Sequence, residues 1–162
     1  MNARQATNKN GFTIIEVVLV LAIAALIFLM VFIALPSLQR NQRDTQRKDD
    51  IGRTLTAVNN YQSNNRGKLP AVQTDWDDFG IKYLNTDDDE FQDPSEGEDY
   101  VFDLRTGTDA GDAPTWDDEP GQIFINTDST CGDDGAVDDD QGTRKVALRI
   151  ALEGGGVYCQ SN

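Results

Sequence analysis

The dominant hydrophobic pattern is a continuous apolar run near the N-terminus. From Phe12 to Leu35 the chain reads FTIIEVVLVLAIAALIFLMVFIAL, 24 residues of which only Glu16 is charged. As an α-helix this run would be about 36 Å long, enough to cross a bilayer core of about 30 Å. A helix that is apolar on all sides belongs in lipid or at the centre of a bundle. We therefore predict a transmembrane or bundle-core helix over residues 12–38.

The next segment, residues 39–70, changes to an amphipathic pattern. Its apolar positions recur at spacings of four, three and three residues, which places them on one helix face: Ile51, Leu55, Val58 and Tyr61. The stretch NNRGKLP at residues 64–70 supplies glycine and proline punctuation that ends a helix. We expect an amphipathic helix half followed by an exit loop.

Residues 71–162 show the period of β-strands instead. The predicted strands are Tyr100–Arg105, Gln122–Asn126, Lys145–Leu152 and Val157–Gln160. An antiparallel sheet laid on the amphipathic helix would bury the apolar faces of both. The sequence thus predicts an α+β fold, in which a long N-terminal helix packs on a small antiparallel β-sheet head.

Composition and charge narrow the possible functions of this head. The net charge is −14, and residues 71–140 carry 23 acidic side chains against Lys82 and Arg105. Such a field repels phosphate backbones, so we do not expect nucleic acid as a partner, and it suits a soluble extracellular surface. Histidine is absent, and no phosphate-binding loop, nucleophile elbow or CxxC pair occurs. We predict no enzymatic activity and no cofactor.

Two features of the acidic head leave alternatives open. The carboxylates between Asp128 and Asp140 are chemically suited to calcium, although they match no spaced calcium loop and such runs are usually solvated. We therefore assign no metal ligands. Trp76 and Trp116, flanked by aspartates, are either exposed adhesive aromatics or partly buried loop anchors.

The two cysteines, Cys131 and Cys159, lie far from the apolar run. A single pair outside a membrane segment indicates one disulfide formed in an oxidising compartment. Two unrelated free thiols are the alternative, and they would fit a cytosolic protein better.

The residues before the apolar run distinguish among membrane roles. A secretory signal has a shorter apolar region and a small-residue cleavage site after it, whereas here the run leads into QRNQRDTQRKDD. A plain membrane anchor leaves two features unexplained. One is Glu16, a carboxylate inside the apolar run, and the other is the short polar leader MNARQATNKNG that ends in Gly11.

Together, the leader, Gly11 and the following FTIIE resemble the type IV prepilin motif. The resemblance covers roughly residues 1–70 and implies a cleaved leader at residues 1–11. It also implies that a membrane aspartic peptidase cuts between Gly11 and Phe12 and that Phe12 is then N-methylated. The C-terminal half matches the family only in layout, with Cys131 and Cys159 in the place of the disulfide-bounded region of many pilins.

The chemistry of Glu16 supports this resemblance. Cleavage after Gly11 would leave a new amine on Phe12 and a carboxylate four residues later in apolar surroundings. A charge that is costly in a low dielectric becomes favourable when paired with an opposite charge and hydrogen-bonded. Glu16 of an incoming subunit would pair with the Phe12 amine of a neighbour, which sets register during assembly.

Two further features of the helix have competing interpretations. Pro36 either kinks or locally melts the helix in the filament, or marks a helix boundary at the membrane exit. Four basic residues form a stripe with three interpretations: Arg40, Arg43, Arg47 and Lys48. The stripe meets anionic lipid headgroups, meets the acidic heads of neighbouring subunits, or is a solvated helix face laced with Asp44, Asp49 and Asp50.

The resemblance implies a structural subunit of a type IV pilus, inserted in the cell membrane by a single span and then assembled into an extracellular filament. Its partners would be other copies of the chain, the prepilin peptidase, the pilus assembly platform and a surface or host-cell receptor. Adhesion and possible twitching motility are the expected functions. A minor pilin, a secretion-system pseudopilin, a DNA-uptake pilin and a plain anchor for an acidic domain are the alternatives.

Overall fold

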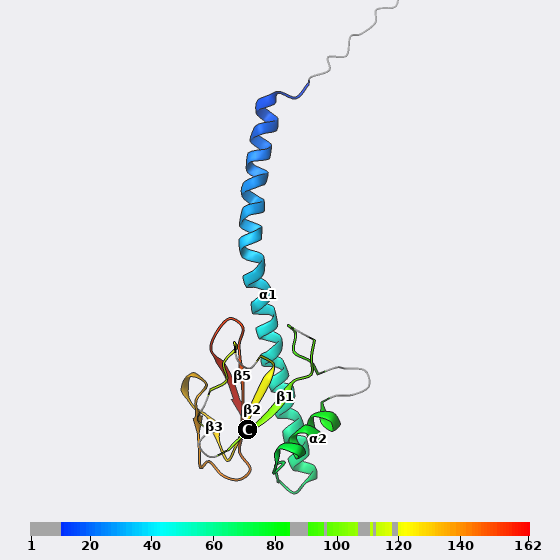
Figure 1. Ribbon diagram of the computed structural model, residues 1–162, viewed down its shortest axis with the longest axis vertical. Helices are drawn as coiled ribbons and strands as arrows, with labels where there is room; N and C mark the ends of the chain where they lie inside the picture. Colours follow the sequence, from blue (N-terminus) through cyan, green and yellow to red (C-terminus); the bar gives the residue numbers. More distant parts are fainter. Residues whose placement is uncertain (1–10, 85–90, 96, 107–110, 112, 118–119) are drawn as a thin grey trace, which may run out of the picture. The chain divides into compact units, whose positions relative to one another are not determined.

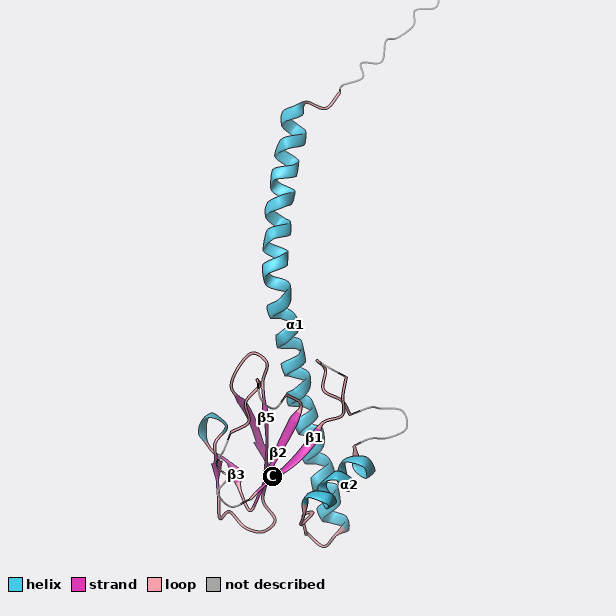
Figure 2. Ribbon diagram, viewed as in Figure 1, coloured by secondary structure: helices cyan, strands magenta, loops and turns pink. Residues whose placement is uncertain are grey.

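A computed structural model describes residues 11–84, 91–95, 97–106, 111, 113–117 and 120–162. The helices are α1 (Ile14–Asn64) and α2 (Gln73–Tyr83), with a short 3-10 turn η2 (Asp133–Gly135). The strands, magenta in Figure 2, are β1 (Val101–Arg105), β2 (Gln122–Thr127), β3 (Thr130–Cys131), β4 (Val137–Asp138), β5 (Val146–Ala151) and β6 (Val157–Ser161). The chain forms two units, Met1–Leu38 and Gln39–Asn162.

The principal sheet of the second unit has the strand order β1-β2-β5-β6. The β2–β5 and β5–β6 pairs are antiparallel, as predicted, but β1 pairs with β2 in parallel. The sheet is therefore mixed, and the expectation of a wholly antiparallel sheet was wrong in this one pair. Residues 106–121 connect β1 to β2, and a connection of this length can return the chain to the starting end of the sheet.

All four predicted strands are present, with small changes at their ends. Tyr100, Lys145 and Leu152 lie just outside β1 and β5, whereas β2 and β6 each extend one residue further than predicted. The second sheet, formed by β3 and β4, was not predicted because each strand has only two residues. So short a stretch carries no readable alternation.

The core of the second unit lies between the sheet and the C-terminal part of α1 (Figure 1). Alternate strand residues face it: Ile123 and Ile125 from β2, and Val146, Leu148 and Ile150 from β5. From α1 the predicted face contributes Ile51, Leu55 and Val58, which are buried, and Tyr61, which is half-buried. The amphipathic prediction for this helix segment is confirmed.

Helix α2 was not predicted, although its apolar residues do have helical spacing. Trp76 and Phe79 are fully or almost fully buried, and Tyr83 stacks on Phe79 with ring centroids 5.3 Å apart. Exposed aspartates occupy the other faces, which made the stretch read as a polar loop. Gly80 allows the close approach of β1, because a Cβ at this position would lie 2.6 Å from the Phe102 ring.

Candidate functional site

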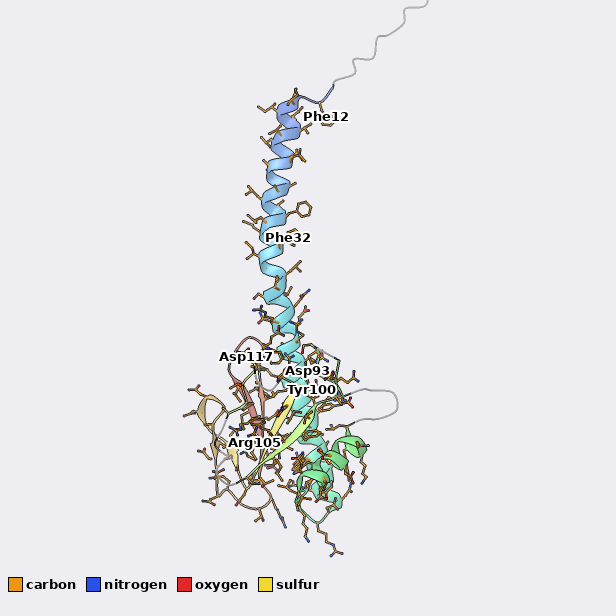
Figure 3. All side chains as sticks on the ribbon, viewed as in Figure 1. Phe12, Phe32, Asp93, Tyr100, Arg105 and Asp117 are labelled. Atoms are coloured by element: carbon orange, nitrogen blue, oxygen red, sulfur yellow. A yellow bond between two sulfur atoms is a disulfide. The ribbon has the colours of Figure 1, made fainter. Side chains whose placement is uncertain are left out.

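The segment around the predicted cleavage site begins α1. Helix α1 starts at Ile14, directly after Thr13, and both Gly11 and Phe12 precede it. Phe12 is 90% exposed (Figure 3), and a Cβ built on Gly11 would meet no atom within 4 Å. Nothing within the described residues therefore requires glycine at position 11 for steric reasons. A requirement for Gly11 would have to come from an enzyme that approaches this backbone.

Glu16 folds back onto the N-terminus of its own helix. Its Oε2 accepts hydrogen bonds from the backbone N–H of Thr13 at 2.9 Å and from the Thr13 hydroxyl at 2.8 Å. The Thr13 Oγ1 in turn accepts from the Glu16 backbone N–H at 3.4 Å. This reciprocal pair is a capping box, which satisfies donors that the first helical turn leaves free.

The capping box was missed in the sequence, although its signal is present. Thr13-Ile-Ile-Glu16 follows the pattern of Ser or Thr, two residues, then Asp or Glu, directly before an apolar run. A negative charge in the first turn is also favourable beside the positive end of the helix dipole. Glu16 thus has a role within a single chain that must be separated experimentally from any role in assembly.

The apolar part of α1 is long and exposed. The helix meets the length and composition of a membrane span, and none of the residues in its most apolar window is buried. Phe12 and Phe32 are 90% and 73% exposed, and both are drawn on this part of the chain in Figure 3. A soluble protein does not leave such a surface in water, so lipid or other helices must cover it.

Pro36 lies inside α1, which continues without interruption to Asn64. The interpretation of Pro36 as a helix boundary was therefore wrong. Proline has no N–H to donate to the carbonyl of Phe32, one turn earlier, so the helix lacks one backbone hydrogen bond there. A kink or a melted stretch at this position in an assembled filament stays a prediction.

The arginines of the predicted basic stripe are paired with acidic side chains of the same unit. Arg47 is fully buried and donates to Asp93 from Nε at 2.7 Å and Nη2 at 2.9 Å, and to Asp44 from Nη1 at 3.0 Å. Arg43 donates to both carboxylate oxygens of Glu153, at 2.7 and 2.5 Å. These two arginines are thus committed to internal pairs. The interpretation as a helix face laced with acids anticipated Asp44 beside the stripe, but none of the three anticipated the pairs with Asp93 and Glu153.

Asp44 and Arg40 complete this network at the turn between β5 and β6. The two oxygens of Asp44 accept from the backbone N–H groups of Glu153 and Gly154, each at 2.9 Å. Arg40 Nε lies 3.6 Å from Glu153. Charges that would be costly if buried alone are stabilised here by mutual pairing. The network fastens the β5–β6 turn and the segment around Asp93 to α1.

The contacts around this network shift the pKa values of its carboxyl groups and of the nearby Asp50. Burial raises the pKa of the Asp93 carboxyl, but hydrogen bonds from Arg47 and Ser95 outweigh it and leave the pKa below its usual range. Hydrogen bonds from Arg43 likewise lower the pKa of Glu153. Asp50 behaves differently, since burial raises its pKa despite a 3.0 Å hydrogen bond from the Tyr100 hydroxyl. Asp93 and Tyr100 are both labelled in Figure 3.

The described parts of the acidic loops show no arrangement suited to a metal. In the described part of the chain, no group of three or more His, Cys, Asp or Glu side chains is placed to hold an ion. Between Asp128 and Asp140, two carboxylates make hydrogen bonds within the loop: Asp128 accepts from the Gly142 N–H at 2.5 Å, and Asp139 from the Ser129 hydroxyl at 2.8 Å. A further acidic run, TDDDE at residues 86–90, lies outside the described residues.

Neither tryptophan is an exposed aromatic, so the adhesive interpretation of both is wrong. Trp76 is fully buried in α2, and Trp116 is half-buried beneath the Arg47 guanidinium, whose Cζ lies 4.3 Å from the ring centroid. The alternative, in which they anchor their segments, describes both better. Trp76 is buried even more completely than that alternative proposed.

The disulfide between Cys131 and Cys159 is present, and the described chain contains no free cysteine. It joins β3 to β6 across a separation of 28 residues. A hydrogen bond from the Cys131 N–H to the Ser161 hydroxyl at 3.2 Å runs beside it. The bridge therefore holds the small second sheet against the edge of the principal one.

Comparison with known proteins gives one match. Residues 6–32 match the family model of the prokaryotic N-terminal methylation motif, and residues 6–10 of this match lie outside the described structure. No curated protein and no solved structure matches the chain significantly. The matched motif belongs to structural, pilin-type proteins and implies processing by a prepilin peptidase and insertion in the membrane.

This match agrees with the elements found in the structure. The motif supports a precursor of the pilin-like or pseudopilin type. A long apolar helix and an α+β unit with a small mixed sheet are the architecture expected of such a protein. From residue 6 to residue 32, the chain carries the prokaryotic N-terminal methylation motif, the signature of type IV prepilins.

Proposed function

We propose that the chain is the precursor of a structural subunit of a type IV pilus. It is inserted in the membrane by its apolar helix, cleaved between Gly11 and Phe12, N-methylated on Phe12 and assembled into an extracellular filament. The observation that carries this proposal is the methylation motif at residues 6–32, whose described part overlaps the exposed apolar part of α1. Adhesion is the expected function of the filament, and twitching motility follows if the cell can retract it.

The exposed apolar surface supports assembly as well as insertion. In lipid, the side chains from Phe12 to Leu35 are covered by acyl chains, and in a filament they would be covered by the helices of other subunits. The apolar side chains are therefore shielded from water both in the membrane and in the filament. Transfer from membrane to filament therefore need not expose this surface to water.

Glu16 favours the transfer of the subunit from the membrane into the filament. A charged carboxylate within a spanning helix costs about 2.5–3.5 kcal/mol at the helix centre on insertion scales, and less near the interface. Cleavage creates a positively charged amine on Phe12, and such an amine on a neighbouring subunit is a partner for this carboxylate. Pairing the two charges in the apolar filament core favours docking in one register.

The capping box defines what this pairing must compete with. Glu16 Oε2 already accepts two hydrogen bonds from Thr13, at 2.9 and 2.8 Å. The second carboxylate oxygen, Oε1, makes no hydrogen bond to a described residue. We propose that Oε1 meets the neighbour's amine while Oε2 continues to cap the helix.

Electron microscopy and mass spectrometry of sheared surface filaments test the proposed function. The proposal expects filaments in which this chain is the most abundant protein. If the chain is a trace component, a minor pilin role replaces the major one. If it is found only in a secretion complex, the pseudopilin role replaces both, and if it stays in the membrane without entering any filament, the proposal is wrong.

Nucleic acid is not among the partners we propose. The chain carries a net charge of −14, which opposes the approach of a phosphate backbone. Among the basic residues of the helix, Arg43 and Arg47 are engaged by Glu153, Asp44 and Asp93. We therefore expect that intact filaments do not retain DNA at physiological salt.

A further inference from the structure

A mixed polar groove lies where the end of α1 meets the loop before β5. Its volume is about 530 Å³, within the usual range for ligand pockets. Its rim carries three exposed basic side chains, Arg66, Lys68 and Arg144. The rest is lined by threonine and apolar residues, and by one acidic residue, Asp128, whose carboxylate accepts from the Gly142 N–H. The charged residues of the lining are therefore three basic and one acidic.

The turn that ends α1 sets the geometry of this rim. Gly67, at φ +80°, closes the turn by donating its N–H to the Gln62 carbonyl at 2.7 Å. A Cβ on Gly67 would lie 2.9 Å from Arg144 Nε, so the absence of a side chain lets the guanidinium lie against the turn. Gln62 Nε2 also donates to the Arg144 carbonyl at 2.7 Å, which fixes the backbone of the opposite wall.

These three basic groups differ from the arginines of the buried network. Arg43 and Arg47 are paired with acids, whereas no described carboxylate lies within 4.0 Å of the charged groups of Arg66, Lys68 or Arg144. In a chain of net charge −14, unpaired cations gathered on one groove are a local exception. The groove therefore attracts an acidic group.

The groove lies near the C-terminal end of strand β6, and an acidic turn of complementary charge lies near the N-terminal end of the same strand. The acidic turn consists of Asp133, Asp134 and Asp138, all exposed, and no described basic group lies within 4.0 Å of their carboxylates. Gly135, in the same turn, packs against Val157, the first residue of β6. Arg144 lies at the opposite end, where its carbonyl accepts from the Asn162 side chain at 3.0 Å.

We infer that the groove of one subunit binds the acidic turn, Asp133, Asp134 and Asp138, of a second copy of this chain. The inference rests on the proposed filament function and names a contact between the Gln39–Asn162 units of neighbouring subunits. Because these units are strongly acidic, their close packing in a filament is opposed by like-charge repulsion. Pairing the basic groove with a neighbour's acidic turn offsets part of that repulsion where the subunits meet.

The symmetry of this contact suits a filament. The groove and the acidic turn are different surfaces separated by the length of β6, which is about 13 Å for its four residue steps. A contact between two different surfaces is heterologous, and it continues from copy to copy instead of closing into a two-fold dimer. Each subunit would accept one neighbour in its groove and offer its acidic turn to another.

A charge-swap experiment on the full-length chain tests the inference. Arg144→Glu and Asp133→Arg, made singly, each place like charges in the contact, and we expect each to lower the yield of sheared filaments about tenfold. The double variant restores opposite charges in reverse order and should recover most of the yield. Lys82→Glu is the matched control, since Lys82 is 66% exposed on α2, outside the groove, and the net charge change equals that of Arg144→Glu.

Carbodiimide cross-linking of intact filaments gives an independent measurement. The reagent joins an ammonium to a carboxylate in contact with it, so Lys68 should be linked to Asp133, Asp134 or Asp138 of a neighbour. Cross-linked dimers should appear on a denaturing gel, with the linked peptides identified by mass spectrometry. Lys68→Arg is the control, because arginine keeps the charge but does not react, and its filaments should form without this cross-link.

The outcomes separate this inference from the proposed function. Wild-type filaments that contain the chain, together with normal yields from Arg144→Glu and Asp133→Arg, would overturn the inference and leave the filament function intact. A second outcome would also overturn the inference: Arg144→Glu gives a normal filament yield, but its filaments no longer bind an anionic polysaccharide that wild-type filaments bind. That result would assign the groove to an external ligand. Absence of the wild-type chain from any filament would instead refute the proposed function on which the inference rests.

Discussion

Arg47 of α1 and Asp93, 46 residues later in the chain, form a buried bidentate ion pair. The guanidinium donates from Nε at 2.7 Å and from Nη2 at 2.9 Å, and the side chains are 0% and 5% exposed. Arg47 also donates to Asp44 and lies over the ring of Trp116. One buried cation thereby joins the helix to two segments that precede and follow β1.

Replacing Asp93 by asparagine should destabilise the Gln39–Asn162 unit strongly. The substitution leaves Arg47 buried with one carboxylate fewer, and breaking a buried pair in this way costs about 3–5 kcal/mol. Denaturant unfolding of the full-length chain in detergent measures the loss. Asp78→Asn is the matched control, because Asp78 is 68% exposed on α2 and its pair with Lys82 should contribute less than about 1 kcal/mol. Equal losses for the two variants would show that the buried pair is not a special determinant of stability.

The same pair predicts how stability depends on pH. The pKa of Asp93 is lowered in the folded chain, so its stabilising effect is present above the ordinary carboxyl pKa and is lost as the pH falls through the lower folded value. The difference in melting temperature between the wild type and Asp93→Asn should therefore shrink below about pH 4. Comparing the two proteins cancels the opposite contribution of Asp50, whose pKa is raised. A difference that stays constant from pH 7 to pH 3 would contradict this assignment.

Removing the disulfide should lower stability without changing the principal sheet. Cys131 and Cys159 close a loop of 28 residues, and the chain-entropy model gives about 3–4 kcal/mol for a loop of this size. The double variant Cys131→Ser/Cys159→Ser should unfold at lower denaturant concentration and should keep its far-ultraviolet circular dichroism. Ser129→Ala controls for disturbance of the loop, since it removes one side-chain hydroxyl near β3 and keeps the bridge. Unchanged stability of the double cysteine variant would show that the bridge is dispensable.

Charge and capping at Glu16 can be separated with three variants. Glu16→Gln keeps a side-chain oxygen that can accept from Thr13 and removes the charge, whereas Thr13→Ala removes the hydroxyl and keeps the charge. If the carboxylate pairs with a neighbour's amine, Glu16→Gln and Glu16→Ala should be inserted and cleaved but should form few filaments. Thr13→Ala should assemble almost normally.

The opposite pattern would assign Glu16 to its own helix. In that case Glu16→Gln would give a normal filament yield and Thr13→Ala would be defective. Immunoblotting for the leader and quantification of sheared filaments distinguish a failure of cleavage from a failure of assembly.

Elements with a strong local pattern could be predicted from the sequence. The apolar run from Phe12 to Leu35 and the alternation in β5 depend on residues close together in the chain, and both were identified. The disulfide needed no geometry either, because Cys131 and Cys159 are the chain's two cysteines. Long, strongly periodic segments carry enough information in themselves.

Features that depend on distant partners could not be predicted. Arg47 reads as one member of a solvated basic stripe until the fold brings Asp93 beside it. The parallel pairing of β1 with β2 depends on the path of residues 106–121, which no local pattern specifies. The capping box formed by Thr13 and Glu16 is different, because it is local and was readable in the sequence.

The most direct test of the proposed function is the mass of the N-terminal peptide of the chain recovered from surface filaments. Processing between Gly11 and Phe12 followed by methylation predicts a peptide that begins at Phe12 and carries one additional methyl group on its amine. Recovery of the chain only from the membrane, with Met1–Gly11 still attached, would contradict the proposal that it is a processed pilus subunit.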